Sequence, residues 1–232
     1  MDMSGVLESA KLDGIVKNQI EAIGTELTGT KVSVGGVSIK LTEGVGQITK
    51  LRVANPKGYE TDEALSMNLL RLGINLPSVG KNPLVLNELV IDSPLLNMEM
   101  NEKGGSNLKE ISDNLTANTS AADKEASSAQ EQAGGEPLRI LIRKLTIKGV
   151  SYVVRSPVEK LDNAKGTLPT ITMSNVGGSK GGTPGEIGKI IVGKMTERVI
   201  AQAAKAGIES AVDKKLKDVG GGLGDALKNL GQ

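Results

Sequence analysis

Carboxylates are the main side chains in this sequence that could carry acid–base or metal chemistry. The 232 residues include 27 aspartates and glutamates but no histidine and no cysteine. Without imidazole or thiol there is no Ser–His or Cys–His nucleophile pair, and the usual ligands of zinc, haem and iron–sulfur clusters are missing. What remains is a carboxylate pair of glycosidase type, or an oxygen-ligated Ca²⁺ or Mg²⁺ site.

The acidic residues do not form such a site in the sequence. Asp62, Glu63, Asp92 and Glu99 stand at expected turn and surface positions, where carboxylates usually serve solvation. The sequence also lacks EF-hand spacing, Walker glycines before Lys-Ser/Thr and a Rossmann-type glycine turn. We therefore expect no enzyme, no metal and no cofactor, and keep a hydrolase based on Asp or Glu as the minor alternative.

Charge and aromatic content argue against a nucleic-acid partner. The formal net charge is +1, so no global field attracts a polyanion, and the two tyrosines are the only aromatic residues. No stretch approaches the roughly 20 apolar residues of a membrane span, and the first residues lack the features of a signal peptide. We expect a cytosolic protein or one whose targeting segment precedes this sequence.

The residues suited to binding a ligand are aliphatic. Leu, Ile, Val and Met alternate with polar residues along several predicted strands, which gives each strand one apolar face. Such a face can hold acyl chains by burying apolar surface at about 25 cal/mol per Å², and methionine adapts to irregular partners. The groove candidates are Leu65, Met67, Leu86, Ile91, Met98, Met100, Ile140, Ile142 and Tyr152. Each is also a normal core residue, because alternation does not reveal what covers the face.

Bent strands have to position these residues. Alternation over 32–41 is interrupted by Gly35-Gly36, and a turn at 44–46 leads into a strand over 47–54. Within 65–76 the alternation shifts by one residue between Leu69 and Leu70, which predicts a bulge.

An internal repeat organises the strands. Residues 84–93 and 140–149 align without a gap, and each is followed by a second strand, over 96–100 and 152–154. A shorter copy covers 48–56. We interpret the repeat as one β-hairpin unit used several times.

Helices are expected on both sides of the strands. Apolar residues at three- and four-residue steps predict a helix over 4–27, and Thr183, Pro184 and Glu186 form the start of a second helix that runs to about Val219. Its apolar rows wind around the helix, which favours packing on a twisted sheet. A short helix is expected over 107–115. The Ala-, Ser-, Gln- and Glu-rich stretch 116–136 is expected to be a mobile linker.

The predicted fold class is α+β. We expect a curved, mostly antiparallel sheet of repeated long β-hairpins, with the N-terminal helix and the long C-terminal amphipathic helix packed on it. The domains are an N-terminal helix over 1–28, a β-groove-like domain over 29–176 with a flexible insertion at 118–136, and a glycine-rich connector with the C-terminal helix over 177–232.

Several segments together are typical of one protein family. They are GTKVSVGGVSI from Gly29, GQITKLRVANPKGY from Gly46, LVIDSP from Leu89 and GGSNL from Gly104. The stretch from about Lys17 to Gly149 resembles AsmA-like bacterial envelope proteins, and the C-terminal helix resembles them more weakly. The resemblance implies a β-groove with an apolar concave face, in a periplasmic protein tethered to the inner membrane by a segment upstream. Larger members are thought to carry phospholipid toward the outer membrane.

Two functional hypotheses follow. In the first, the apolar face is an open groove that binds phospholipid in lipid transport or outer-membrane biogenesis. In the second, the C-terminal helix fills this face, and the chain is a scaffold subunit that binds an envelope protein or a second copy of itself by strand addition at a sheet edge.

Overall fold

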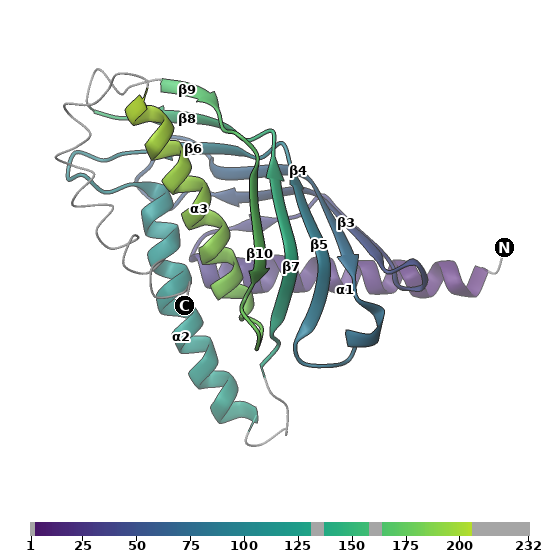
Figure 1. The fold of residues 1–232 in the computed structure, drawn as a ribbon. Helices are drawn as coiled ribbons and strands as arrows, with labels where there is room; N and C mark the ends of the chain where they lie inside the picture. The colour runs from purple at the N-terminus through teal and green to yellow at the C-terminus, as the bar shows by residue number, and fades with distance from the viewer. Residues whose placement is uncertain (1–2, 131–136, 158–163, 206–232) are drawn as a thin grey trace.

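The computed structural model describes residues 3–130, 137–157 and 164–205 (Figure 1). These residues form an α+β fold with three α-helices and one curved, mostly antiparallel sheet of ten strands. The helices are α1 (Met3–Thr28), α2 (Asn107–Gln130) and α3 (Pro184–Lys205). The strands are β1 (Val32–Ser33), β2 (Gly36–Lys40), β3 (Val45–Ala54), β4 (Glu63–Ile74), β5 (Leu84–Asp92), β6 (Leu95–Glu99), β7 (Ile140–Lys148), β8 (Ser151–Arg155), β9 (Ala164–Thr167) and β10 (Ile171–Val176). Two 3-10 turns, η1 (Leu41–Glu43) and η2 (Leu76–Ser78), join β2 to β3 and β4 to β5.

Several of these strands are halves of longer, bent strands. β4 pairs antiparallel with both β5 and β6 in one continuous register, from Leu65↔Leu96 to Leu70↔Ile91. β5 and β6 are therefore consecutive parts of one strand along β4, and they do not pair with each other. The predicted hairpin repeat is wrong in this respect, because alternation marks a strand but does not identify its partner. The repeated unit is a bent strand.

The two long copies of the repeat lie side by side. β5 and β6 pair in parallel with β7 and β8, and every partner is the equivalent residue of the other copy, from Leu84↔Ile140 to Glu99↔Arg155. The shorter copy, residues 48–56, lies in the antiparallel strand β3 and has no such partner. Residues that align in the sequence are thus also the residues that pair in the sheet.

All the long strands bend at one row of residues, which we call the crease. When the pairing of each two neighbouring strands is continued through the bend, one residue of each long strand falls in the same row. The residues of this row are not paired with one another. The row consists of Gly35, Lys50, Asn68, Ser93, Gly149 and Pro169, all of them exposed. Lys50, Ser93 and Gly149 have positive φ values of 52°, 52° and 64°. A residue in this conformation turns the strand and shifts its alternation by one.

The predicted phase slip in β4 falls at the crease. Met67 is buried before Asn68 and Leu70 after it, so the same face stays inside on both sides. The register with β3 nevertheless runs unchanged from Thr49↔Leu69 to Leu51↔Met67, so the slip is not a bulge between these strands. The register shifts of β4 lie elsewhere, at Gly73/Ile74 against β5 and at the β3 end against Ala54.

The crease divides the sheet into two arms. β2, β5, β7 and β10 form the long arm, and β1, β6, β8 and β9 form the short arm; β3 and β4 run through both. Figure 1 shows β6, β8 and β9 running across the direction of β5, β7 and β10, with α2 and α3 side by side in the angle between them.

Helix α1 confirms the predicted N-terminal helix and packs along the edge formed by β1 and β2. Its side chains accept hydrogen bonds from the N–H groups of this edge. Val32 N–H donates to Thr25 Oγ1 at 3.0 Å, Val34 N–H to Glu21 Oε1 at 2.8 Å and Ile39 N–H to Asp13 Oδ1 at 2.8 Å. These three donors are therefore not available for strand addition at this edge. The opposite edge is formed by β9 and β10.

Helix α2 corrects the predicted linker. The helix continues past Leu115 to Gln130, whereas residues 116–136 were expected to be mobile; residues 131–136 lie outside the described residues. Alanine, glutamate and glutamine are good helix formers, so the absence of large apolar residues did not mean the absence of a helix. Thr119 is still buried at this level of α2.

Helix α3 begins as predicted. Thr183 N–H donates to Glu186 Oε2 at 2.8 Å, and Glu186 N–H donates to Thr183 Oγ1 at 3.4 Å, which is a capping box. The expected continuation to Val219 lies beyond the last described residue, Lys205.

Candidate functional site

The nine groove candidates lie in the interior of the protein. Leu65, Met67, Leu86, Ile91, Met98, Ile142 and Tyr152 are buried, and Met100 and Ile140 are partly buried against the same cluster. The structure therefore brings all nine together, on the inner face of the two arms. They contact neighbouring apolar side chains and do not line an open surface.

Apolar residues of α2 and α3 complete this cluster. The buried residues of the two helices are Leu108, Ile111, Leu115, Ile187, Ile191, Val192, Met195 and Val199. Met195 and Val199 have no exposed surface, like Leu96 of the short arm and Leu145 of the long arm. The buried residues of α2 and α3 therefore belong to the same apolar cluster as those of the strands, and α2, which the sequence did not suggest for this role, contributes to it together with α3.

The two covering helices touch closely at one point. A Cβ atom at Gly185 would overlap Thr119 Oγ1 and lie 3.0 Å from Thr119 Cβ, so only glycine allows this approach. One turn further along α3, a Cβ at Gly188 would contact Leu115 at an ordinary 3.5 Å. The crossing of α2 and α3 is therefore shaped by specific residues and belongs to the packed core.

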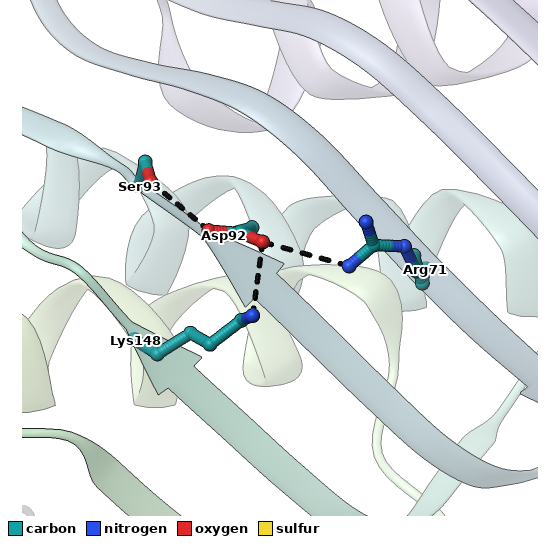
Figure 2. A network of polar contacts seen from close by, with 4 residues as sticks. All are labelled: Arg71, Asp92, Ser93 and Lys148. Carbon is teal, nitrogen blue, oxygen red and sulfur yellow. Dashed lines mark hydrogen bonds and ion pairs between the residues drawn. The ribbon is translucent and has the colours of Figure 1, made fainter.

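The outer face of the sheet carries the first group of charged residues. Figure 2 shows Asp92 of β5 between Arg71 of β4 and Lys148 of β7. Asp92 Oδ2 lies 3.1 Å from Lys148 Nζ and 3.5 Å from Arg71 Nη1, and Ser93 Oγ donates to Asp92 Oδ1 at 2.9 Å. The hydrogen bonds from Lys148 and Ser93 hold the pKa of Asp92 below its ordinary value. This carboxylate is paired with cations across three strands.

The two repeat copies carry opposite charges at equivalent outer positions. Asp92 faces Lys148, and Glu88 Oε1 lies 2.8 Å from Lys144 Nζ. Arg143 also donates to Asn87 Oδ1 at 3.0 Å. Individual exposed ion pairs contribute little stability, but like charges directly opposite each other would disfavour a wrong partner. The charges therefore favour pairing of the first copy with the second.

A second polar group lies in the interior at the end of the short arm. Glu99 is buried, although the sequence suggested a solvated carboxylate. It accepts hydrogen bonds from Asn55 Nδ2 at 2.9 Å, from Glu60 N–H at 2.7 Å, and from both the N–H and the hydroxyl of Thr61. Burial alone would raise the pKa of Glu99, but the hydrogen bonds from Thr61 and Glu60 hold it below its ordinary value.

Asn107 connects Glu99 to the start of α2. Its amide donates to Asn55 Oδ1 at 2.7 Å and to the Asn97 carbonyl at 2.6 Å, while its Oδ1 accepts from Glu99 N–H at 2.9 Å. Asn107 has no exposed surface. We call Asn55, Thr61, Glu99 and Asn107 the polar node. These residues are joined to one another by hydrogen bonds, so the node fixes the loop over 55–62 against β6 and α2.

The polar node brings together two segments that are far apart in the sequence. Asn55 belongs to ANPKGY and Asn107 to GGSNL. Tyr59 of the first segment lies near α2, and burial, followed by the charge of Glu110, raises the pKa of its hydroxyl. Sequence reasoning missed the node. The available signal was a carboxylate between Met98 and Met100, on a strand whose neighbours are buried.

Among the residues that the structure describes, no group of three or more Asp or Glu side chains could hold a metal ion. A hollow of about 360 Å³ on β2 and β3 is lined by Ser38, Lys40, Glu43, Val45, Gly46 and Gln47, away from the apolar cluster. Within the described part of the chain, no helix is long and apolar enough to cross a membrane.

Comparison with known proteins identifies no relative. No protein-family model matches the chain, and no curated protein matches it. The resemblance to AsmA-like proteins therefore depends on the quoted segments alone.

Proposed function

We propose that this chain is a non-catalytic scaffold module of the bacterial cell envelope, with a filled core where a lipid-handling relative would have an open groove. One observation carries the proposal: all nine groove candidates are buried or partly buried in one cluster with α2 and α3. The envelope location and the tether to the inner membrane depend on the family resemblance.

The polar groups support a structural role. Asp92 pairs with Arg71 and Lys148 across three strands, and Glu99 holds a loop by four hydrogen bonds. A catalytic acid or base needs access to a substrate proton. Glu99 is enclosed by its partners, and Asp92 lies on an open strand face without a second carboxylate partner in the network of Figure 2.

Lipid handling is the second candidate, and the arrangement of α3 is what favours it. α3 is the last described element and follows a glycine-rich connector, and its buried residues share one cluster with aliphatic side chains and with methionines such as Met67 and Met98. If α3 moved away, the inner face would form an apolar groove of the kind that the resemblance implies.

A reversible lock on α3 separates the two functions. Thr119→Cys combined with Gly185→Cys places two Cβ atoms about 3.0 Å apart. Because a disulfide needs a Cβ–Cβ distance of roughly 3.5–4.5 Å, α2 and α3 must separate by about 0.5–1 Å in the double variant, and the oxidised bond then holds them together. The natural chain has no cysteine, so the oxidised bond is unambiguous. The single variant Thr119→Cys is the matched control.

The readout is uptake of a fluorescent phospholipid by the purified protein. The scaffold function predicts no stoichiometric uptake by the natural chain or by the reduced or oxidised double variant. Uptake by the natural chain and the reduced double variant that stops on oxidation would overturn it in favour of lipid handling.

A further inference from the structure

Exposed aliphatic residues gather at the end of the long arm. Among the described residues, seven large hydrophobic side chains are exposed, and five of them lie on the loops and strand ends at this end. The five are Leu41, Val45, Leu76, Val79 and Leu138, with exposed fractions between 41% and 51%. The other two, Ile15 and Ile23, lie on α1. The clustering distinguishes these five from apolar residues scattered over a normal surface.

These loops form one continuous surface, which we call the loop rim and define as residues 40–45, 75–83, 137–139 and 178–182. The first two loops touch, because Ile74 N–H donates to the Gly44 carbonyl at 2.7 Å and a Cβ at Gly44 would lie 3.4 Å from Leu76. Asn82 Nδ2 donates to the Pro137 carbonyl at 2.9 Å, which joins the second loop to the third.

The last loop joins the rim through Arg139. Its guanidinium donates to the Gly181 carbonyl at 3.0 Å, and Arg139 N–H donates to Asn82 Oδ1 at 2.9 Å. The loop rim is therefore held together by hydrogen bonds, while its aliphatic side chains point to solvent.

The charge of the loop rim is predominantly positive. It contains Lys40, Lys81, Arg139 and Lys180 and one acidic residue, Glu43, which lies 3.3 Å from Lys40. Glu186 is the nearest acidic residue on α3, and its carboxylate accepts the Thr183 N–H of the helix cap. Cations around exposed aliphatic residues match an interface with anionic headgroups above an apolar layer.

We propose that the loop rim docks on the surface of an anionic lipid bilayer. The aliphatic residues stand on three neighbouring segments, where they can enter the headgroup region, and the cations meet the phosphates. A protein partner is the less suitable occupant, because the cores of protein interfaces are enriched in aromatic residues and depleted in lysine. The proposal goes beyond the scaffold function and does not need an open groove.

Vesicle binding tests the proposal. The probe is large unilamellar vesicles of equal parts phosphatidylcholine and phosphatidylglycerol, with pure phosphatidylcholine vesicles for comparison, and the readout is co-sedimentation of the full chain. We expect binding to the anionic vesicles that weakens with salt, because the Debye length falls from about 10 Å to about 3 Å between 0.1 and 1 M. No binding, or equal binding to both vesicles, would overturn the proposal.

Paired variants locate the surface. Leu76→Ser with Val79→Ser, and separately Lys40→Glu with Lys81→Glu, should each weaken partition by about tenfold or more. The controls are Ile23→Ser on α1 and Lys165→Glu on β9, which are exposed residues outside the loop rim and should bind as the natural chain does. Loss of binding in the controls, or its retention in the rim variants, would contradict the proposal.

Two further measurements keep the outcome interpretable. Circular dichroism and thermal melting of each variant show whether it is folded, and the exposed rim residues should tolerate the changes. The oxidised Thr119→Cys/Gly185→Cys variant should bind vesicles like the natural chain, because docking uses the loop rim and not the inner face. Loss of vesicle binding on oxidation would overturn docking by the rim, whatever the outcome of the lipid-uptake assay.

Discussion

At the end of the short arm, the loops after β3 and β6 meet around buried polar side chains, whereas at the end of the long arm the loops expose aliphatic ones. Glu99 and Asn107 are buried at the first end, and Leu76 and Val79 are exposed at the second. Both ends are held by hydrogen bonds between loops. The difference is that polar groups stabilise the interior of one end, while the other end presents apolar surface that its own stability does not require.

One sheet thus has residues that stabilise the fold at one end and residues available for binding at the other. Removing a buried hydrogen-bonded group leaves its partners unsatisfied, so changes at the polar node should destabilise the protein. Removing an exposed aliphatic side chain leaves nothing unsatisfied, so changes at the loop rim should affect only binding.

The largest effect is expected for Glu99→Ala. The change leaves the N–H groups of Glu60 and Thr61 and the hydroxyl of Thr61 without the carboxylate that accepts from them, and we expect the free energy of unfolding to fall by about 3 kcal/mol. Urea denaturation followed by circular dichroism measures it. Glu43→Ala at the loop rim is the matched control, with an expected change within about 0.5 kcal/mol. Equal losses of stability for Glu99→Ala and Glu43→Ala would show that the two ends of the sheet do not differ in this way.

Acid should weaken the polar node, because protonation of Glu99 removes its charge. The folded pKa of Glu99 lies below the ordinary value of 4.5, so its contribution is complete above that value and is lost as the pH falls through the folded pKa. Stability measured from neutral pH down through this range should fall more in the natural chain than in Glu99→Gln, which cannot titrate there. Parallel curves for the two proteins would show that Glu99 contributes nothing through its charge.

The crease that joins the two ends should be sensitive to backbone conformation. Gly149 has φ 64°, so Gly149→Ala should cost about 1–2 kcal/mol. Gly188→Ala is the opposite control, because it lies inside α3 with room for a methyl group, and helix propensity predicts stabilisation by up to about 1 kcal/mol. Thermal melting compares both with the natural chain. A neutral Gly149→Ala would argue that the bend does not depend on this residue.

The smallest effect on stability is expected at the loop rim. Leu76→Ser with Val79→Ser should change the free energy of unfolding by less than about 0.5 kcal/mol, although the same pair should abolish most vesicle binding. Urea denaturation measures the first quantity. A loss comparable to Glu99→Ala would mean that these side chains stabilise the fold, and the contrast between the ends would disappear.

The sequence predicted the α+β class, the three helix starts and the repeat, because these depend on local periodicity and capping. It could not predict that β5 and β6 form one bent strand, since the pairing of β4 with both is a long-range property. The shift between Leu69 and Leu70 was visible in one strand. Its extension into a crease through Ser93 and Gly149 became clear only from the register.

At the candidate site, the sequence identified the nine apolar residues of the inner face but not the part of α2 that packs in the same cluster. Alternation identifies a buried face, while the element that buries it depends on tertiary packing. α2 was expected to end near Leu115, so α3 was the only helix considered for this role. Glu99 was assigned to solvent because isolated carboxylates are usually exposed, and its partners Asn55 and Thr61 belong to a loop some 40 residues earlier in the sequence.

Hydrogen exchange under native conditions tests the central claim, that the inner face is a filled core, most directly. If α2 and α3 are permanent parts of the core, the amides of Ile91, Ile142 and Met195 should exchange only through global unfolding, with the free energy of opening that urea denaturation gives. If α3 and the strands beneath it exchange through a smaller opening while the polar node stays protected, the helices are a movable cover. The inner face would then be a groove and not a filled core.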